Sequence, residues 1–400
     1  MDFLRGFLFK KMSNIKDNNN FTKEDRRYMN LAIKLAERGR GDTNPNPMVG
    51  AIIVKDGKII SSGYHKQAGL NHAEIEAINN SRQSLESSTM YVTLEPCTFT
   101  GKTPPCVNEI VKYKFKKIII GCIDPNPKVN GRGIEFLKKA GIKTKSGLLK
   151  NKVEQQNEVF FKQTKTGIPF ICCKIASSID GKLASKSSDS KWITSERSRM
   201  QVQDLRKEYG CILTGINTVL NDNPYLFPRK NIEHSYKNYN SQKFYRVILD
   251  SNLRINLDSN IVKTSNLAKT IVFIEDKNKF KFTGKIKKLE ENNIDVLPVN
   301  KDIVEPAGLD ILKILKILYK KYEITSILLE CGPTLITSFL KRNLIDKFVF
   351  YFAPKIIGGD SDYNMFTGLG INKIKNSINL RFENIKRIGS DIAITAYPLK

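Results

Sequence analysis

The fold of the first half of this 400-residue chain is decided by residues 89–122, which read TMYVTLEPCTFTGKTPPCVNEIVKYKFKKIIIGC. Short apolar runs at 90–94 and 116–122 predict two buried strands, and residues 105–113 between them predict a helix. Strand, helix and strand therefore alternate within one short stretch. This alternation is typical of an α/β layered domain.

The same pattern extends to both sides of this stretch. Residues 49–55 and 58–64 flank Asp56-Gly57, a dipeptide typical of a two-residue hairpin turn. A helix is predicted over residues 22–37, where Thr22 and Asp25 resemble a capping box. Further elements complete the first half: a helix that begins near 72, a helix at 133–140 and a strand near 142.

The alternation restarts after a polar junction at 162–169. Strands are predicted at 170–176, 211–215, 245–250, 270–275, 326–330 and 347–353, and helices at 195–209, 309–322 and 334–342. The chain is also longer than one compact core requires. We therefore expect a disordered, Asn- and Lys-rich extension over residues 1–22, a first domain over 23–150 and a second α/β domain over 151–400.

The composition excludes some classes of protein. The formal charge is +26, but the positive residues are scattered rather than clustered with aromatic ones, so the pattern does not favour nucleic-acid binding. No apolar run is long enough to span a bilayer. The seven cysteines fall largely in apolar runs, as packed reduced thiols do. We expect a cytoplasmic monomer or homo-oligomer without nucleic-acid or membrane partners.

Three short motifs carry the chemistry of the first half: His72-Ala73-Glu74, Pro96-Cys97 and Pro105-Cys106. A catalytic zinc ion needs three protein ligands and one position open to water, whose pKa it lowers to near neutrality. One imidazole and two thiolates supply such a set. Glu74 follows the histidine at the spacing that zinc deaminases use for their proton-shuttling carboxylate. The sequence thus predicts one Zn²⁺ held by His72, Cys97 and Cys106.

The spacing of the two cysteines is unusual. Eight residues separate them, whereas two separate the cysteines of the commoner nucleic-acid deaminases. The insert predicts a loop over the pocket, in which Lys102 is placed to meet a phosphate.

In both halves the chain resembles the bifunctional riboflavin-biosynthesis deaminase/reductase family. The motifs of the first half are Asn44-Pro45-Asn46-Pro47-Met48-Val49-Gly50, His72-Ala73-Glu74, Glu95-Pro96-Cys97, Gly101-Lys102-Thr103-Pro104-Pro105-Cys106 and Asp124-Pro125-Asn126-Pro127. Those of the second half are Ser178-Ile179-Asp180-Gly181-Lys182, Ser190-Lys191-Trp192-Ile193-Thr194, Asp222-Asn223-Pro224 and Glu330-Cys331-Gly332-Pro333-Thr334. The resemblance runs from about residue 24 to the C-terminus, in the order that the family has.

The resemblance implies a cytidine-deaminase-like three-layer α/β/α domain, followed by a dihydrofolate-reductase-like α/β domain. The first would deaminate a diamino-ribosylaminopyrimidinone phosphate to the aminouracil, with Asn46 and Lys102 contacting this substrate. The second would reduce the ribosyl group to ribityl with NADPH. The implied NADPH contacts are Ala176, Trp192, Thr218, Asp222, Ser251, Gly332, Pro333, Thr334, Leu335, Ile336, Thr337 and Ser338. The implied contacts of the second domain to its substrate are Ser190, Arg206, Leu226, Arg229 and Glu330.

The residues themselves support the second half less directly. The chain has no G-x-G-x-x-G fingerprint. The strand at 326–330, a Gly-Pro turn and a helix do predict a phosphate cradle, because helix N-termini favour anions. Arg206 and Arg229 suit bidentate phosphate binding. Lys174 and Asp180 are candidates for the proton donor of the reduction.

Two positions have open roles. Many relatives have a histidine between the first cysteine and the Gly-Lys-Thr-Pro-Pro-Cys segment, where this chain has Thr98-Phe99-Thr100. We expect altered substrate affinity there and an intact zinc set. His65 fits a pocket contact and a surface turn equally well.

Two other functions compete with this interpretation. One is a nucleobase or tRNA deaminase with an unrelated C-terminal domain, which the basic charge favours and the cysteine spacing opposes. The other is a zinc-stabilised RNA-binding protein, which would need a fourth protein ligand, with His65 as the candidate.

Overall fold

The structure is a computed structural model, and it describes residues 21–101, 103–187, 189–228, 244–302, 308–359 and 363–399. The chain divides into two compact units, Met1–Lys165 and Thr166–Lys400. The predicted junction at 162–169 contains this division. The predicted domain boundary at 150 lies instead at the start of α6 (Lys150–Gln156), and α7 (Glu158–Thr166) follows before the division. Most of the predicted N-terminal extension lies outside the described residues.

The first unit is built on a five-stranded sheet of order β2-β1-β3-β4-β5. Its strands are β1 (Gly50–Lys55), β2 (Lys58–Tyr64), β3 (Thr89–Leu94), β4 (Lys117–Cys122) and β5 (Lys143–Ser146). β1 is antiparallel to both β2 and β3, whereas β3, β4 and β5 are parallel. Asp56 and Gly57, with φ of 50° and 73°, form the predicted tight turn between β1 and β2.

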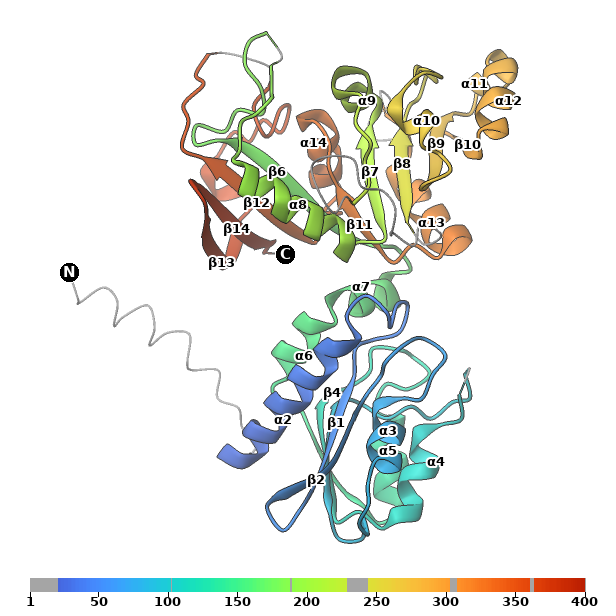
Figure 1. Ribbon diagram of the computed structural model, residues 1–400, viewed down its shortest axis with the longest axis vertical. Coiled ribbons are helices and arrows are strands. Elements are labelled where there is room, and N and C mark those ends of the chain that lie inside the picture. Colours follow the sequence, from blue (N-terminus) through green and yellow to red (C-terminus); the bar gives the residue numbers. More distant parts are fainter. Residues whose placement is uncertain are drawn as a thin grey trace, which may run out of the picture. The chain divides into compact units, whose positions relative to one another are not determined.

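Helices cover both faces of this sheet (Figure 1). Ile52 and Val54 of β1 pack toward α2 (Lys23–Ala36), while Ala51 and Ile53, which alternate with them, pack in the core formed with the helices of the other face. Those helices are α3 (Ala73–Asn79), α4 (Cys106–Ile110) and α5 (Arg132–Lys139). The predicted three-layer arrangement of the first unit is therefore confirmed.

Local signals fix where α2 and α3 lie. Thr22 caps α2 by accepting from Asp25 N at 3.0 Å, and the Asp25 carboxylate accepts from Thr22 N at 2.9 Å. Thr22, predicted as the end of the extension, thus belongs to this helix. A β-carbon on Gly63 would lie 2.3 Å from Ala77 N, so only glycine lets α3 pack so closely on β2.

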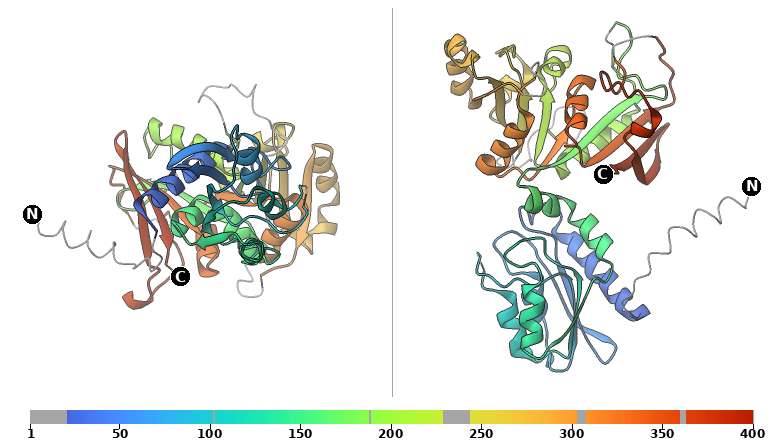
Figure 2. Two further views of the ribbon diagram at one scale, coloured as in Figure 1. Left: turned by 90° about the horizontal axis from the view of Figure 1, so that it is seen from below. Right: turned by 180° about the vertical axis from the view of Figure 1, so that it is seen from behind.

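The second unit contains a nine-stranded sheet of order β10-β9-β8-β7-β11-β6-β12-β14-β13. Its strands are β6 (Phe170–Ser178), β7 (Cys211–Gly215), β8 (Tyr245–Leu249), β9 (Lys269–Glu275), β10 (Ile294–Val299), β11 (Ser326–Leu329), β12 (Lys347–Ala353), β13 (Leu380–Ile388) and β14 (Asp391–Pro398). The strands from β10 to β12 are parallel. The antiparallel β13–β14 hairpin forms one edge and carries the C-terminus (Figure 2).

Helices connect these parallel strands, as α/β topology requires. They are α8 (Glu196–Glu208), α9 (Ile216–Asp222), α10 (Asn260–Lys263), α11 (Asn278–Lys281), α12 (Thr283–Glu291), α13 (Ile311–Tyr322) and α14 (Pro333–Lys341). β6 lies between β11 and β12, so the first strand of this unit pairs with two strands that come much later in the chain. Among the described residues, no helix is long and apolar enough to cross a membrane.

Candidate functional site

His72, Cys97 and Cys106 come together in the first unit. His72 is the N-cap of α3, Cys106 is the first residue of α4, and Cys97 lies in the loop after β3. His72 Nδ1 is 3.2 Å from Cys106 Sγ and 3.5 Å from Cys97 Sγ. The three ligand atoms all lie within 4.8 Å of one another.

This geometry fits a tetrahedral zinc ion. Bonds of about 2.0 Å to nitrogen and about 2.3 Å to sulfur would separate the two ligand atoms by about 3.5 Å. His72 Nε2 lies 3.4 Å from Thr103 Oγ1, which is placed to accept its N–H and so leave Nδ1 for a metal. The Cys106 thiol donates to Cys97 and lowers the pKa of Cys97. A cation between the two sulfurs would replace that shared proton.

A pocket of about 250 Å³ surrounds this group, and we call it the His72 pocket. Glu74, in the first turn of α3, is 3 % exposed and lines this pocket. Burial raises the pKa of Glu74 to about 7, against a partly compensating effect of His72. A carboxyl group with such a pKa can accept and donate a proton near neutral pH.

His65 orients Asn46 in the His72 pocket. The imidazole is 2 % exposed, so His65 is a buried pocket residue rather than part of a surface turn. Its Nδ1 lies 3.0 Å from Asn71 O, which can only accept, so Nδ1 carries the proton. Nε2 then accepts from Asn46 Nδ2 at 3.1 Å. The Asn46 side-chain oxygen remains available to a ligand.

One buried carboxylate joins the loops around the His72 pocket. Glu95, two residues before Cys97, accepts four backbone N–H groups at 2.9–3.2 Å, those of Asp124, Gly131, Gly133 and Ile134. It thereby connects the Cys97 loop to the start of α5 and to the loop that carries Asp124. Burial raises the pKa of Asp124, which also lines the pocket, to about 6.

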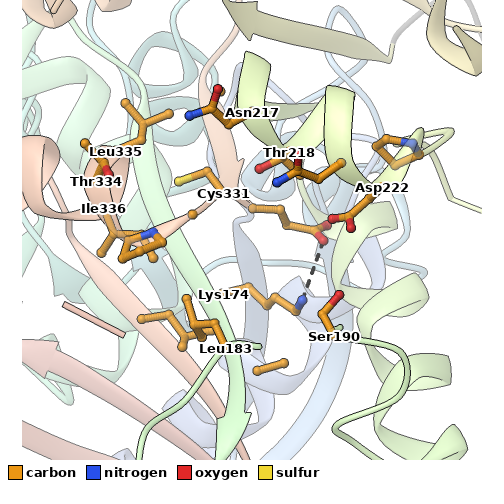
Figure 3. A pocket seen from close by; sticks show the side chains of 18 of the residues that line it. Lys174, Leu183, Ser190, Asn217, Thr218, Asp222, Cys331, Thr334, Leu335 and Ile336 are labelled. Carbon is orange, nitrogen blue, oxygen red and sulfur yellow. Dashed lines mark ion pairs between the residues drawn. The ribbon is translucent and has the colours of Figure 1, made fainter. Parts of the chain in front are cut away.

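The second unit contains a larger cavity of about 760 Å³, which we call the Glu330 cavity. Thr334, Leu335 and Ile336 of α14 border one side, and Thr218 and Asp222 of α9 border another (Figure 3). The N-terminus of α14, with Gly332 as its cap and Pro333 at the first position, opens toward this cavity and suits an anion.

Glu330 is 8 % exposed and is held by cations. Arg206 Nε and Nη2 donate to its two oxygens at 2.6 and 2.8 Å, and Lys174 Nζ lies 3.7 Å away, the ion pair dashed in Figure 3. Burial by itself would raise the pKa of Glu330, but the charge of Arg206 outweighs it and lowers the pKa to about 2. Glu330 is therefore a fixed negative charge.

Trp192 is an exposed part of the cavity wall. The Arg199 guanidinium lies 4.3 Å from the centre of its ring, and both residues line the Glu330 cavity. A planar cation on an indole makes a flat platform that a nucleotide ring or a phosphate can approach.

Two family models match this chain, one in each unit. Residues 22–122 match the family model described as the cytidine and deoxycytidylate deaminase zinc-binding region. Residues 169–394 match the RibD C-terminal domain. The chain is 38 % identical to riboflavin biosynthesis protein RibD of Aquifex aeolicus, over 92 % of this chain and 97 % of that protein. The RibD of Escherichia coli K12 is 35 % identical, over 93 % and 98 %.

Solved structures give the same result. Acinetobacter baumannii RibD superposes with a TM-score of 0.80 at 34 % identity, over 94 % of this chain and 99 % of that one. A diaminohydroxyphosphoribosylaminopyrimidine deaminase/5-amino-6-(5-phosphoribosylamino)uracil reductase of Thermotoga maritima gives 0.76 at 32 % identity, with the same coverage. The chain belongs to the bifunctional riboflavin-biosynthesis deaminase/reductase family. It is a two-activity enzyme that uses Zn²⁺ and NADPH.

In the deaminase unit, the structure brings together His72, Cys97, Cys106, Glu74 and Asn46, all predicted from the sequence. Lys102 lies outside the described residues. Phe99, of the segment that replaces the family histidine, lines the pocket and puts an aromatic ring there. The ligand group found among the described residues has three members, and both nitrogens of His65 are engaged elsewhere, so His65 is not a fourth ligand.

In the reductase unit, nearly all predicted contacts line the Glu330 cavity. They are Ala176, Ser190, Trp192, Arg206, Thr218, Asp222, Leu226, Ser251, Glu330, Gly332, Pro333, Thr334, Leu335, Ile336 and Ser338. Thr337 is buried and does not line it, because successive residues of a helix face different directions. Arg229 lies outside the described residues. The guanidinium group of Arg206, which the sequence predicts to bind phosphate, instead donates to Glu330.

Several pocket residues have no role in the sequence-based prediction. Asp124 and Asn126 line the deaminase pocket, and the Asp-Pro-Asn-Pro motif that contains them was the available signal. Arg199 lines the reductase cavity, and no sequence signal distinguishes it from a surface arginine. Of the two candidate proton donors, Lys174 lines the cavity. Asp180 accepts from the backbone of Ile357 and Gly358 and is not part of the lining.

Proposed function

We propose that residues 23–165 deaminate a diamino-ribosylaminopyrimidinone phosphate to the aminouracil, with His72, Cys97 and Cys106 as the zinc ligands and Glu74 as the proton carrier. The observation that carries this proposal is the placement of three ligand atoms within 4.8 Å of one another, beside a buried glutamate. Zinc, when bound, supplies an activated water as the nucleophile.

The reaction needs two proton transfers. Deamination replaces an amino group with an oxygen from water, so one proton must leave the water and another must reach the departing nitrogen. Glu74 is the acid–base group beside the ligands, and it accepts the first proton and donates the second.

The pyrimidine is oriented by polar groups of the same pocket. The free oxygen of Asn46 accepts from the amino or ring N–H of the substrate, because His65 occupies the Asn46 amide nitrogen. Asp124 and Asn126 supply further polar contacts from the opposite loop. Lys102 is proposed to meet the substrate phosphate, as the sequence predicts.

Residues 166–400 are proposed to reduce the ribosyl group to ribityl, with NADPH as the hydride source. We assign NADPH to the walls formed by Ala176, Trp192, Thr218, Asp222, Ser251, Gly332 to Ile336 and Ser338. The substrate contacts are Ser190, Arg206, Leu226, Arg229 and Glu330. Lys174, which lies beside Glu330, is better placed than Asp180 to deliver the proton.

The partners of the protein are small molecules in this proposal. We propose a cytoplasmic enzyme, because all seven cysteines are free thiols, as a reducing compartment maintains them. It acts without nucleic-acid or membrane partners, as a monomer or homo-oligomer.

The deciding experiment combines metal analysis with turnover. We expect about one zinc per chain, deamination of the pyrimidinone phosphate without NADPH, and reduction of the deaminated product when NADPH is added. His72→Ala should lose zinc and deamination while reducing supplied aminouracil phosphate. Deamination of cytidine or RNA, with none of the pyrimidinone phosphate, would establish the competing deaminase function.

A further inference from the structure

Arg246 is an arginine buried inside the sheet of the reductase unit. It lies on β8 and is 0 % exposed. Its guanidinium makes six contacts at 2.8–3.2 Å, with Thr270 Oγ1, Tyr225 O, Thr264 Oγ1, Ile261 O, Thr264 O and Ala268 O. Every one of these acceptors is a hydroxyl or a backbone carbonyl, and none is a carboxylate. Burial lowers the pKa of Arg246 to about 9.

A buried charge without an opposite charge is costly to a protein. Core packing alone would be served by an apolar residue at this interior strand position, which Val247 and Ile248, both buried, follow on β8. The hydrogen bonds therefore indicate what Arg246 contributes. They tie together three segments: β9 through Thr270, the chain around α10 through Thr264, and the Tyr225 carbonyl after α9.

The Tyr225 end of this network reaches the Glu330 cavity. The next residue, Leu226, is 3 % exposed and lines the cavity together with Pro224. Leu226 has a φ of 49°, a left-handed conformation that leucine adopts only where its surroundings hold it. Arg246 Nη1 donates to Tyr225 O at 3.0 Å, and the Phe227 ring lies 6.0 Å from the guanidinium. Both residues that flank Leu226 are thus in contact with Arg246.

We propose that Arg246 is a positioning residue of the reductase: it holds Tyr225 and Phe227 so that Leu226 keeps its left-handed conformation against the substrate. The proposal rests on the proposed contact between Leu226 and the sugar-phosphate substrate. Arg246 touches neither substrate nor NADPH, and it acts through the backbone of residues 225–227.

The first test is Arg246→Lys in the full-length protein. Lysine keeps the charge but cannot span all three segments. We expect the reductase KM for the aminouracil phosphate to rise about tenfold, the effect of losing a hydrogen bond to a charged group. The kcat, the KM for NADPH and the deaminase rate should stay unchanged. A fall in kcat with an unchanged KM would mean that Arg246 only stabilises the fold.

A matched pair of milder variants covers the case in which Arg246→Lys does not fold. Thr264 and Thr270 each accept from Arg246 and each donate to a backbone carbonyl. Thr264 partners Nη1, the nitrogen that holds Tyr225, whereas Thr270 partners Nε. Thr264→Val should raise the substrate KM about threefold. Thr270→Val should leave the substrate KM unchanged, although both variants should lose a similar amount of thermal stability. Equal KM values in the two variants would overturn the proposal.

Leu226→Ala separates this inference from the function on which it rests. A raised substrate KM in Leu226→Ala, together with an unchanged KM in Arg246→Lys and Thr264→Val, would refute the role of Arg246 alone. An unchanged KM in Leu226→Ala would refute the proposed substrate contact itself.

Discussion

Two buried glutamates, one in each unit, differ in the charge they hold. Among the described residues, His72 is the cationic side chain that acts on Glu74, and burial raises the pKa of Glu74 to about 7. Glu330 is buried to a similar degree, but Arg206 binds both of its oxygens, and its pKa falls to about 2. The difference shows that burial does not decide ionisation by itself. A bidentate cation converts a proton carrier into a permanent anion.

The largest effect is expected from Glu74→Gln. The amide keeps the shape of the side chain but cannot carry a proton, so deamination should fall by about 10²- to 10⁴-fold. Zinc content and reductase activity should be unchanged. Glu76→Gln is the matched control, because Glu76 is on the same helix and forms an ion pair with Lys66. Near-normal deamination in Glu74→Gln would remove Glu74 from the chemistry.

The next effect is expected from Arg206→Met, which leaves Glu330 buried without its bidentate partner. The reductase unit should lose about 3–5 kcal/mol of unfolding free energy, and reduction should be lost with it. Urea unfolding followed by a probe in this unit measures the change. The double variant Arg206→Met with Glu330→Leu should recover much of the stability, and a double variant as unstable as the single one would contradict the ion-pair explanation.

The pH dependence of stability distinguishes the two glutamates further. The folded-state pKa of Glu330 is about 2, lower than its ordinary value of 4.5, so folding favours the ionised form. The ionised carboxylate stabilises the folded state by an amount of the order of 3 kcal/mol. This stabilisation is complete above pH 4.5 and is lost as the pH falls toward 2. The difference in unfolding free energy between the native protein and Glu330→Gln should therefore shrink over that interval. A difference that stays constant would mean that Glu330 is not a fixed anion.

The smallest effect on stability is expected from Lys174→Met. Lys174 is 3.7 Å from Glu330 and makes one contact where Arg206 makes two. We expect the unfolding free energy to change by about 1 kcal/mol or less. A loss as large as that of Arg206→Met would show that both cations hold the charge of Glu330 equally.

The sequence is sufficient to predict the fold class and the clustering of His72, Cys97 and Cys106, for a local reason. The histidine and both cysteines belong to short motifs, two at helix starts and one in the loop after β3, and the apolar runs of β1, β3 and β4 are strong. The Arg206–Glu330 pair could not be predicted, because 124 residues separate its members and only the sheet order brings them together.

The elements that sequence patterns missed are mostly polar or exposed. α6 buries a single residue, Val153, so it has no apolar stripe to reveal it. β13 is exposed along nearly its whole length, and its sequence lacks the alternation of a half-buried strand. The role of Arg246 cannot be predicted from the sequence, because an arginine next to apolar strand residues gives no sign that its side chain is buried.

The position of β6 between β11 and β12 has a consequence for synthesis on the ribosome. The first unit is complete once residue 165 has emerged, but β6 obtains its two neighbours only after residue 353. β11 ends at residue 329, about 150 residues after β6, so at roughly 5–20 residues per second both edges of β6 stay unpaired for about 8 to 30 seconds. We therefore expect a chain truncated before residue 326 to keep both edges of β6 unpaired and to aggregate.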